Sequence, residues 1–136
     1  MEGDDVIVVD THVILWDALK PELLSERAKQ VIARANEGDG IIFCEISLWE
    51  IAMLVQKERV CIEASYQDFI QWVFLSNKYQ YQGVTPEIAE LSTQLPKEIN
   101  KDPADRIIAA TSLVQKIPLV TADTNLRRSG MLTTIW

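Results

Sequence analysis

Short runs of apolar residues recur along the chain and constrain its fold more than any other feature. Val6–Val9 is rich in β-branched residues and does not alternate with polar residues, as is typical of a strand buried on both faces of a parallel sheet. Ile41–Cys44 is a second run of this kind. Further candidate strands are Tyr81–Val84, Pro118–Thr121 and Leu132–Ile135.

Segments with helical periodicity or helix-start signals lie between these runs. Ser47 and Glu50 form a capping-box pattern at the start of one of them. The expected helices are Thr11–Leu19, a helix marked by Pro21 and Ser25 and closed by Gly38, the helix opened by Ser47, Ser65–Asn77, Thr85–Leu95, Asp102–Lys116 and the short Thr124–Ser129. The alternation predicts an α/β fold, with an open parallel sheet built from right-handed crossovers.

The bulk properties indicate a single domain, which we expect to span residues 1–136. Glu2 and Asp4 stand where a signal peptide would carry basic residues, and no segment approaches about 18 uninterrupted apolar residues. Cys44 and Cys61 lack metal-ligand spacing, and we interpret both as buried thiols in a reducing compartment. These features predict a cytoplasmic protein that does not span a membrane.

Four acidic residues fall close to the ends of the predicted strands. Asp10 directly follows the first strand, and Asp123 follows the fourth. Glu50 and Asp105 lie on the first turns of helices that adjoin the second and fourth strands. Ligands of open α/β sheets bind outside the carboxyl ends of the strands, where the strand order reverses. The four carboxylates are therefore expected to share one crevice.

Helix capping is the competing explanation for these acids. Asp10, Asp102 and Asp123 can each be a helix N-cap, and Glu50 can pair with Ser47 in the capping box. Capping explains each residue taken alone, but it gives no reason for all of them to fall at one edge of a sheet.

Carboxylates gathered in one crevice repel one another unless a cation compensates their charge. Mg²⁺ prefers oxygen ligands from one or two carboxylates, with water and phosphate oxygens completing its shell. Such an ion can generate a nucleophile from water and stabilise an in-line displacement at phosphorus. The net charge of −7 argues against nucleic-acid binding by composition alone, but bound divalent cations would invert the field of the pocket.

Each of the other polar side chains near these acids can have either a functional or a structural role. Thr11 and Thr121 can orient water at a metal or simply end a strand, and His12 can contact substrate or have a structural role. The tryptophans are expected in the core or at an interface. Four cations near the acids can hold RNA phosphates or be solvated: Lys101, Arg106, Arg127 and Arg128.

Four stretches of the chain together resemble the PIN-domain ribonucleases of the VapC toxin type. They read VVDTHVILW, ISLWEIAMLV, DPADRIIAAT and PLVTADTNLR, in the family's order and approximate spacing. The resemblance covers essentially the whole chain. It implies a PIN domain with a parallel sheet of four or five strands in the order 3-2-1-4-5, flanked by helices. It departs from the family pattern at Asn100-Lys101, where members often carry His-Arg.

The same resemblance implies Mg²⁺- or Mn²⁺-dependent endonucleolytic cleavage of RNA. It assigns the catalytic and metal-binding roles to Asp10, Glu50, Asp105 and Asp123, with Asp102 as a cap or secondary contributor and Thr121 as the hydroxyl ahead of the last acid. It also implies a homodimer, a role as toxin, and a cognate antitoxin that blocks the acidic pocket.

Three alternatives remain open at this point. The chain can be a PIN nuclease in RNA processing instead of a toxin. It can be an acid-pocket phosphatase or phosphotransferase that uses Asp10 as nucleophile, although such sites commonly have a second acid where this chain has His12. It can also be a non-catalytic binding module with an acidic pocket.

Overall fold

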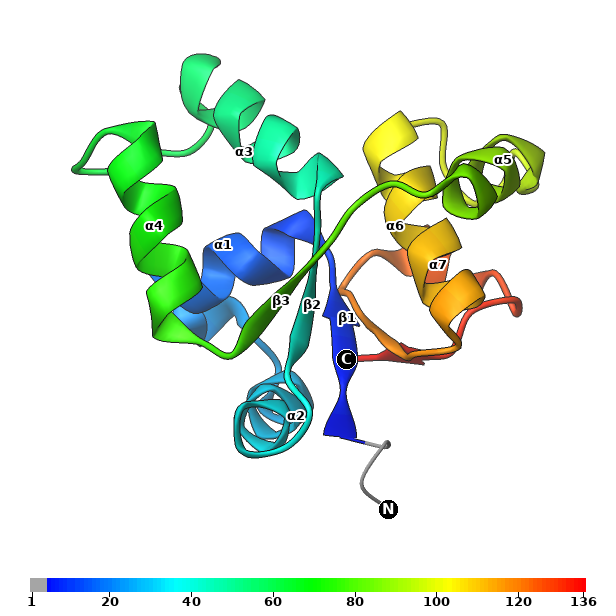
Figure 1. Ribbon diagram of the computed structural model, residues 1–136, viewed down its shortest axis with the longest axis horizontal. Helices are drawn as coiled ribbons and strands as arrows, with labels where there is room; N and C mark the ends of the chain where they lie inside the picture. Colours follow the sequence, from blue (N-terminus) through cyan, green and yellow to red (C-terminus); the bar gives the residue numbers. More distant parts are fainter. Residues whose placement is uncertain (1–4) are drawn as a thin grey trace.

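Five parallel strands form the sheet at the centre of the fold (Figure 1). The computed structural model describes residues 5–136, so Glu2 and Asp4 of the N-terminal prediction lie outside the described residues. The strands follow the order β3-β2-β1-β4-β5. They are β1 (Ile7–Val9), β2 (Ile41–Cys44), β3 (Tyr79–Gln82), β4 (Leu119–Val120) and β5 (Thr134–Ile135). The predicted open parallel sheet and its strand order are confirmed.

The first strand lies between two partners that come later in the chain. Val8 pairs with Ile42 of β2 on one side and with Leu119 of β4 on the other. Every residue of these three strands is buried, as the non-alternating apolar runs predicted. The strand order reverses between β1 and β4, so the residues that follow these two strands meet at the switch point.

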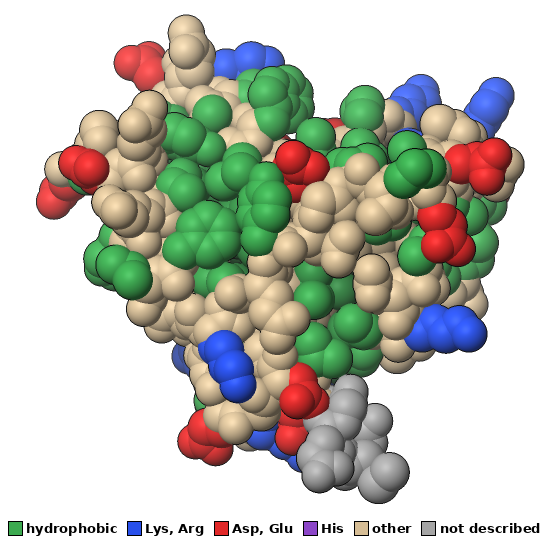
Figure 2. Space-filling model, in the orientation of Figure 1, with side chains coloured by type: hydrophobic (Ala, Val, Ile, Leu, Met, Phe, Trp, Pro, Cys, Tyr) green, Lys and Arg blue, Asp and Glu red, His purple; other side chains and the backbone are tan. Residues whose placement is uncertain are grey.

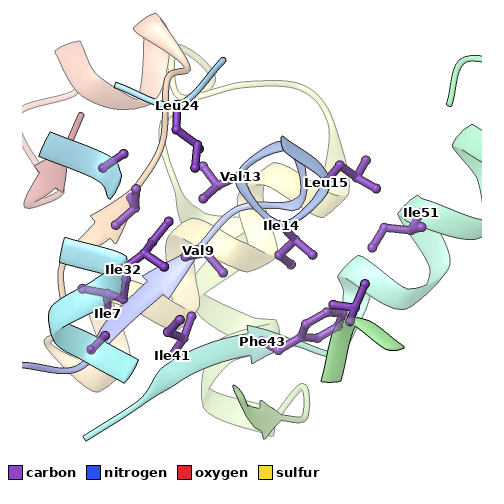
Figure 3. Close-up of a cluster of buried hydrophobic side chains, with 14 of the residues drawn as sticks. Ile7, Val9, Val13, Ile14, Leu15, Leu24, Ile32, Ile41, Phe43 and Ile51 are labelled. Carbon is purple, nitrogen blue, oxygen red and sulfur yellow. The ribbon is translucent and has the colours of Figure 1, made fainter. Parts of the chain in front are cut away.

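Helices cover both faces of the sheet and divide the core into two clusters. Ile14, Ile51 and Phe43 belong to the cluster that α1 to α4 form against one face (Figure 3). Ile88 and Ile108 belong to the cluster that α5 to α7 form against the other. The helices are α1 (Thr11–Leu19), the 3-10 turn η2 (Pro21–Leu23), α2 (Glu26–Glu37), α3 (Ile46–Gln56), α4 (Tyr66–Ser76), α5 (Pro86–Gln94), α6 (Pro103–Gln115) and α7 (Thr124–Arg128).

The capping box expected at the start of α3 does not form. The helix begins at Ile46, and its N-cap residue Glu45 makes no side-chain capping bond. Ser47 is fully buried, and its hydroxyl lies 2.8 Å from the hydroxyl of Thr11 on α1. A contact between two helices has therefore replaced the local bond that the sequence pattern predicted.

The third strand begins and ends earlier than Tyr81–Val84. It lies at the edge of the sheet and pairs only with β2, so its outward side chains remain exposed and its apolar signal is weak. The anchoring residue is Tyr79, whose ring packs edge-on against Phe43 at 5.6 Å. The ring contact therefore packs the start of the strand against β2.

The two cysteines lie in different environments. Cys44 on β2 is buried, as expected, but Cys61 is exposed in the segment between α3 and α4, so the prediction of a second buried thiol is wrong. Within the described part of the chain, no helix has the length and apolar character needed to cross a membrane.

Candidate active site

The acids singled out from the sequence come together at the carboxyl edge of the sheet. Asp10 follows β1, Asp123 follows β4, Glu50 lies on α3, and Asp102 and Asp105 lie at the start of α6. Asp105 is at the centre of the group, because the charges of the other four carboxylates all act on its pKa. The topology therefore brings together five acids that are far apart in sequence.

Three of these acids are also helix N-caps, so the capping interpretation is correct for them. Oδ1 of Asp10 accepts from the backbone N–H of Val13 at 3.0 Å, and Oδ1 of Asp123 accepts from Leu126 in the same way at 3.0 Å. Oδ1 of Asp102 accepts from Ala104 at 2.8 Å. Each cap uses one carboxylate oxygen and fixes the side chain, and the other oxygen remains for the pocket.

Glu50, Asp102 and Asp105 form a compact group of carboxylates. Each offers one oxygen, and these oxygens lie within 4.8 Å of one another. Asp102 therefore has a more central place than the secondary one expected for it. Within the described residues, this group does not include Asp10 or Asp123, although Asn100 joins Asp123 to Asp105.

Glu50 carries an oxygen that the protein leaves unsatisfied. Its side chain is only 5% exposed, and Oε1 is buried without a hydrogen-bond partner among residues 5–136. A buried carboxylate is costly unless it is paired or coordinates a metal. Three hard oxygen donors and an orphaned buried oxygen fit a divalent cation such as Mg²⁺ or Mn²⁺.

The pKa values of the group shift as expected for acids crowded in a buried crevice. Burial raises the pKa of Asp10 and of Glu50. Burial is also the largest cause for Asp105, and the neighbouring carboxylates add to it, so that its pKa rises to about 7. The neighbouring hydroxyls of Thr121 and Thr11 lower the pKa of Asp10 and of Glu50, respectively, and so oppose these shifts. A bound cation would favour the ionised forms.

The two threonines named from the sequence both contact the site. Thr11 is buried and joins α1 to α3 through Ser47. Thr121 is fully buried, and its hydroxyl accepts from the backbone N–H of Asp123 at 3.0 Å. Thr121 therefore holds the backbone at Asp123, and Thr11 holds α1 against the helix that carries Glu50.

Asn100 is a site residue that the sequence analysis noted only as a departure from the family pattern. Its side-chain N–H group donates to Oδ2 of Asp105 at 3.2 Å and to Oδ2 of Asp123 at 3.1 Å. Asn125 in turn donates to Oδ1 of Asn100 at 2.9 Å, which fixes the orientation of the amide. No local pattern marks this role, because it depends on the meeting of two distant segments.

Arg106 does not act as expected. Its guanidinium group donates to four backbone carbonyls, one in the last turn of α5 and three in the connection to α6: those of Ser92, Leu95, Pro96 and Asn100. With its donors used in this way, Arg106 is a structural residue and not a phosphate contact. The other three cations, Lys101, Arg127 and Arg128, are exposed.

The sheet order and the acids at its carboxyl edge together define a PIN domain. The sequence pattern of the PIN domain family matches residues 7–130, and the chain belongs to this family. Among characterised relatives, Ribonuclease VapC22 of Mycobacterium tuberculosis is 33% identical over 132 residues, which cover 96% of this chain and 98% of the relative.

Solved structures share the fold at lower sequence identity. A chain from the VapBC2 structure of Rickettsia felis, bound to a DNA fragment from their promoter, matches with a TM-score of 0.72 at 16% identity, covering 96% of this chain and 97% of that one. A toxin-antitoxin complex from Klebsiella pneumoniae matches with a TM-score of 0.65 at 18% identity, covering 96% of each chain.

Proposed function

We propose that this protein is a metal-dependent endoribonuclease and the toxin of a toxin–antitoxin pair. The observation that carries the proposal is the group of Glu50, Asp102 and Asp105 at the carboxyl edge of the sheet, in which one buried oxygen of Glu50 lacks a partner. The relative named Ribonuclease VapC22 supports RNA as the substrate.

In this proposal the acids hold one or two divalent cations, Mg²⁺ or Mn²⁺. Such ions acidify water and stabilise the charge on phosphoryl oxygens during an in-line displacement. The catalytic and metal-binding residues are Asp10, Glu50, Asp105 and Asp123, to which the geometry adds Asp102. Asn100, Thr11 and Thr121 are positioning residues. Asn100 donates to the carboxylates of Asp105 and Asp123. Thr121 accepts from the backbone N–H of Asp123, and Thr11 bonds to Ser47 on the helix that carries Glu50.

A groove beside the acids suits an antitoxin segment. It has a volume of about 760 Å³ and runs between α1 and α3, with apolar residues such as Trp16, Leu19 and Met53 along it and Glu50 and Asp102 in its wall. An amphipathic segment can bury its apolar side chains there and place a basic side chain against the acids. The toxin-antitoxin complex from Klebsiella pneumoniae, which contains a chain of similar fold, supports an antitoxin as the partner.

A homodimer is also part of the proposal. Apolar side chains gather on the face over α4 and β3 (Figure 2). Trp72 and Tyr81 are each 51% exposed there, and Leu75 is 81% exposed. Exposed apolar patches of this kind commonly mark protein interfaces.

Cleavage of single-stranded RNA with and without Mg²⁺ or Mn²⁺ tests the enzymatic part. The parent should cut RNA only with metal, and Asp10→Asn and Asp105→Asn should lose at least about 100-fold in rate, because they remove charge that holds the cation. Asp68→Asn, on the exposed face of α4, is the matched control and should keep full activity. Equal cleavage by all four proteins would place the activity elsewhere.

The alternatives predict different outcomes. A phosphotransferase that uses Asp10 would form a trapped aspartyl-phosphate, but Asp10 is only 8% exposed and one of its oxygens caps α1. A non-catalytic module would cut no RNA. For a nuclease in RNA processing, expression without an antitoxin should leave growth unchanged, whereas a toxin should arrest growth and Asp10→Asn should relieve the arrest.

A further inference from the structure

A second charged hollow, distinct from the groove beside the acids, has the opposite sign. It has a volume of about 540 Å³ and is lined by Arg27 of α2, by Arg127 and Arg128 of α7, and by Trp136, which follows β5, with smaller residues between them. Among residues 5–136, no Asp or Glu lines it. The chain has a net charge of −7, yet three guanidinium groups gather around this one hollow. Positive charge is therefore concentrated at this place on an otherwise acidic protein.

No ion pair or side-chain hydrogen bond among residues 5–136 uses these guanidinium groups. Arg27, Arg127 and Arg128 are all exposed. Arg106 is the contrasting case, because its guanidinium group donates four hydrogen bonds to backbone carbonyls. The three free groups are therefore available to an anion, and Arg is well suited to bind phosphate.

A row of aromatic rings connects this hollow with the acidic pocket. Trp136 lines the hollow and packs against Trp16 with ring centroids 5.8 Å apart. Trp16 packs against His12 at 5.9 Å. His12 and Trp16 line the groove that also contains Glu50. The rings therefore lead from the acids to the arginines without a break.

We propose that this surface, formed by His12, Trp16, Trp136, Arg27, Arg127 and Arg128, binds the single-stranded RNA that flanks the cleaved bond. The arginines hold phosphates, and the exposed His12 and the half-buried rings of Trp16 and Trp136 offer their accessible surface to bases, which is the combination that proteins use for single-stranded nucleic acid. The inference rests on the proposed nuclease function and names the path of its substrate. It also explains how a protein with an acidic pocket can hold a polyanion.

The test is the binding of a labelled 12-nucleotide single-stranded RNA in EDTA, where the proposed cleavage cannot proceed, over a range of KCl concentrations. The triple variant R27Q/R127Q/R128Q should bind about ten-fold more weakly, and its plot of log K against log salt should be shallower by about two, because three phosphate contacts are lost. The control K57Q/K97Q/K116Q has the same change in charge at exposed sites that do not line the hollow, and it should bind as the parent does.

Substitution of the ring tests the stacking part. Trp136→Leu should weaken binding of the single strand about five-fold or more, Trp136→Phe should retain most of the affinity, and neither should alter binding of duplex DNA. Trp49→Leu, an exposed tryptophan of α3 that lines neither the hollow nor the groove, is the aromatic control. Thermal unfolding of each variant verifies that it is folded.

The outcomes separate this inference from the proposed function. In one outcome the parent cuts RNA, and the triple variant cuts it equally well and binds it with the same affinity and salt dependence. The proposed RNA-binding surface would then be wrong, and the proposed nuclease function would be retained. If the parent cuts no RNA, the proposed nuclease function is wrong. If, in addition, all variants bind RNA in EDTA as weakly as the parent does, the proposed RNA-binding surface is wrong as well. Loss of antitoxin binding by the triple variant, with RNA binding unchanged, would assign the hollow to the protein partner instead.

Discussion

The side-chain amide of Asn100 donates to Oδ2 of Asp123 across a distance of 3.1 Å. This bond joins the segment that leads into α6 to the start of α7, two parts of the chain that converge only at the carboxyl edge of the sheet. The same amide also donates to Asp105. It is a neutral donor between two carboxylates that would otherwise repel each other.

Replacing this donor should destabilise the metal-free protein. Asn100→Leu leaves both carboxylates without the amide, and hydrogen bonds to charged groups contribute about 1.5–3 kcal/mol each, so we expect a loss of about 2 kcal/mol in unfolding free energy in EDTA. Urea unfolding measures it. Asn125→Ala, which removes only the bond to Oδ1 of Asn100, should cost less. An unchanged midpoint for Asn100→Leu would contradict the bridging role.

The raised pKa of Asp105 predicts how stability depends on pH. The folded-state pKa of about 7 exceeds the ordinary value of 3.8, so the folded protein retains a proton that the unfolded chain releases. Stability in EDTA should therefore fall as the pH rises from about 4 to about 7. Asp105→Asn should flatten this dependence and be more stable than the parent at pH 8. Thermal unfolding across this pH range provides the comparison, and a steeper fall in the variant would refute the assignment.

Divalent cations should raise the melting temperature through the same group. At a concentration 100 times the dissociation constant, a ligand that binds only the folded state stabilises it by about 2.7 kcal/mol. Glu50→Gln should lose most of this gain, although removing its buried charge should make it more stable than the parent in EDTA. Glu90→Gln, an exposed position on α5, should respond to Mn²⁺ as the parent does. A full Mn²⁺ response in Glu50→Gln would exclude Glu50 as a ligand.

Replacing Arg106 by lysine should destabilise the protein, although the positive charge at this position is kept. A lysine ammonium cannot reproduce the planar fork that donates to four carbonyls at the end of α5 and in the connection to α6. Arg106→Lys should therefore lose at least about 2 kcal/mol of unfolding free energy. Lys101→Gln, at an exposed neighbouring position, should be close to neutral. Equal stability of the two variants would mean that the carbonyl contacts contribute little.

The parts of the fold that could be predicted are those whose signals are local. Runs such as Ile41–Cys44 indicate buried strands, and cap residues such as Ser65 and Thr85 mark the helix starts that the structure has. Ser47 shows the limit of this approach. Its pattern is that of a capping box, but a buried partner on another helix determines its hydrogen bond.

The residues of the site also fall into those that the sequence predicts and those that it does not. The positions of the acids follow from their place after the strands, because parallel strands end at a common edge. The roles of Asn100 and Arg106 could not be predicted, because each depends on partners brought together by the folded chain. A cation in a sequence does not reveal whether a phosphate or a backbone carbonyl will be its partner, and Arg106 differs from Arg128 only in what the fold places beside it.

Helix α7 is only five residues long, yet Asp123 caps its start and Arg127 and Arg128 lie at its end. If the acids cut and the arginines hold the strand, the length of this helix sets the spacing between the cleaved bond and the bound phosphates. Cleavage would then occur at a constant offset from the held segment, whatever its bases. An insertion of one helical turn would move the cut along the RNA instead of abolishing it.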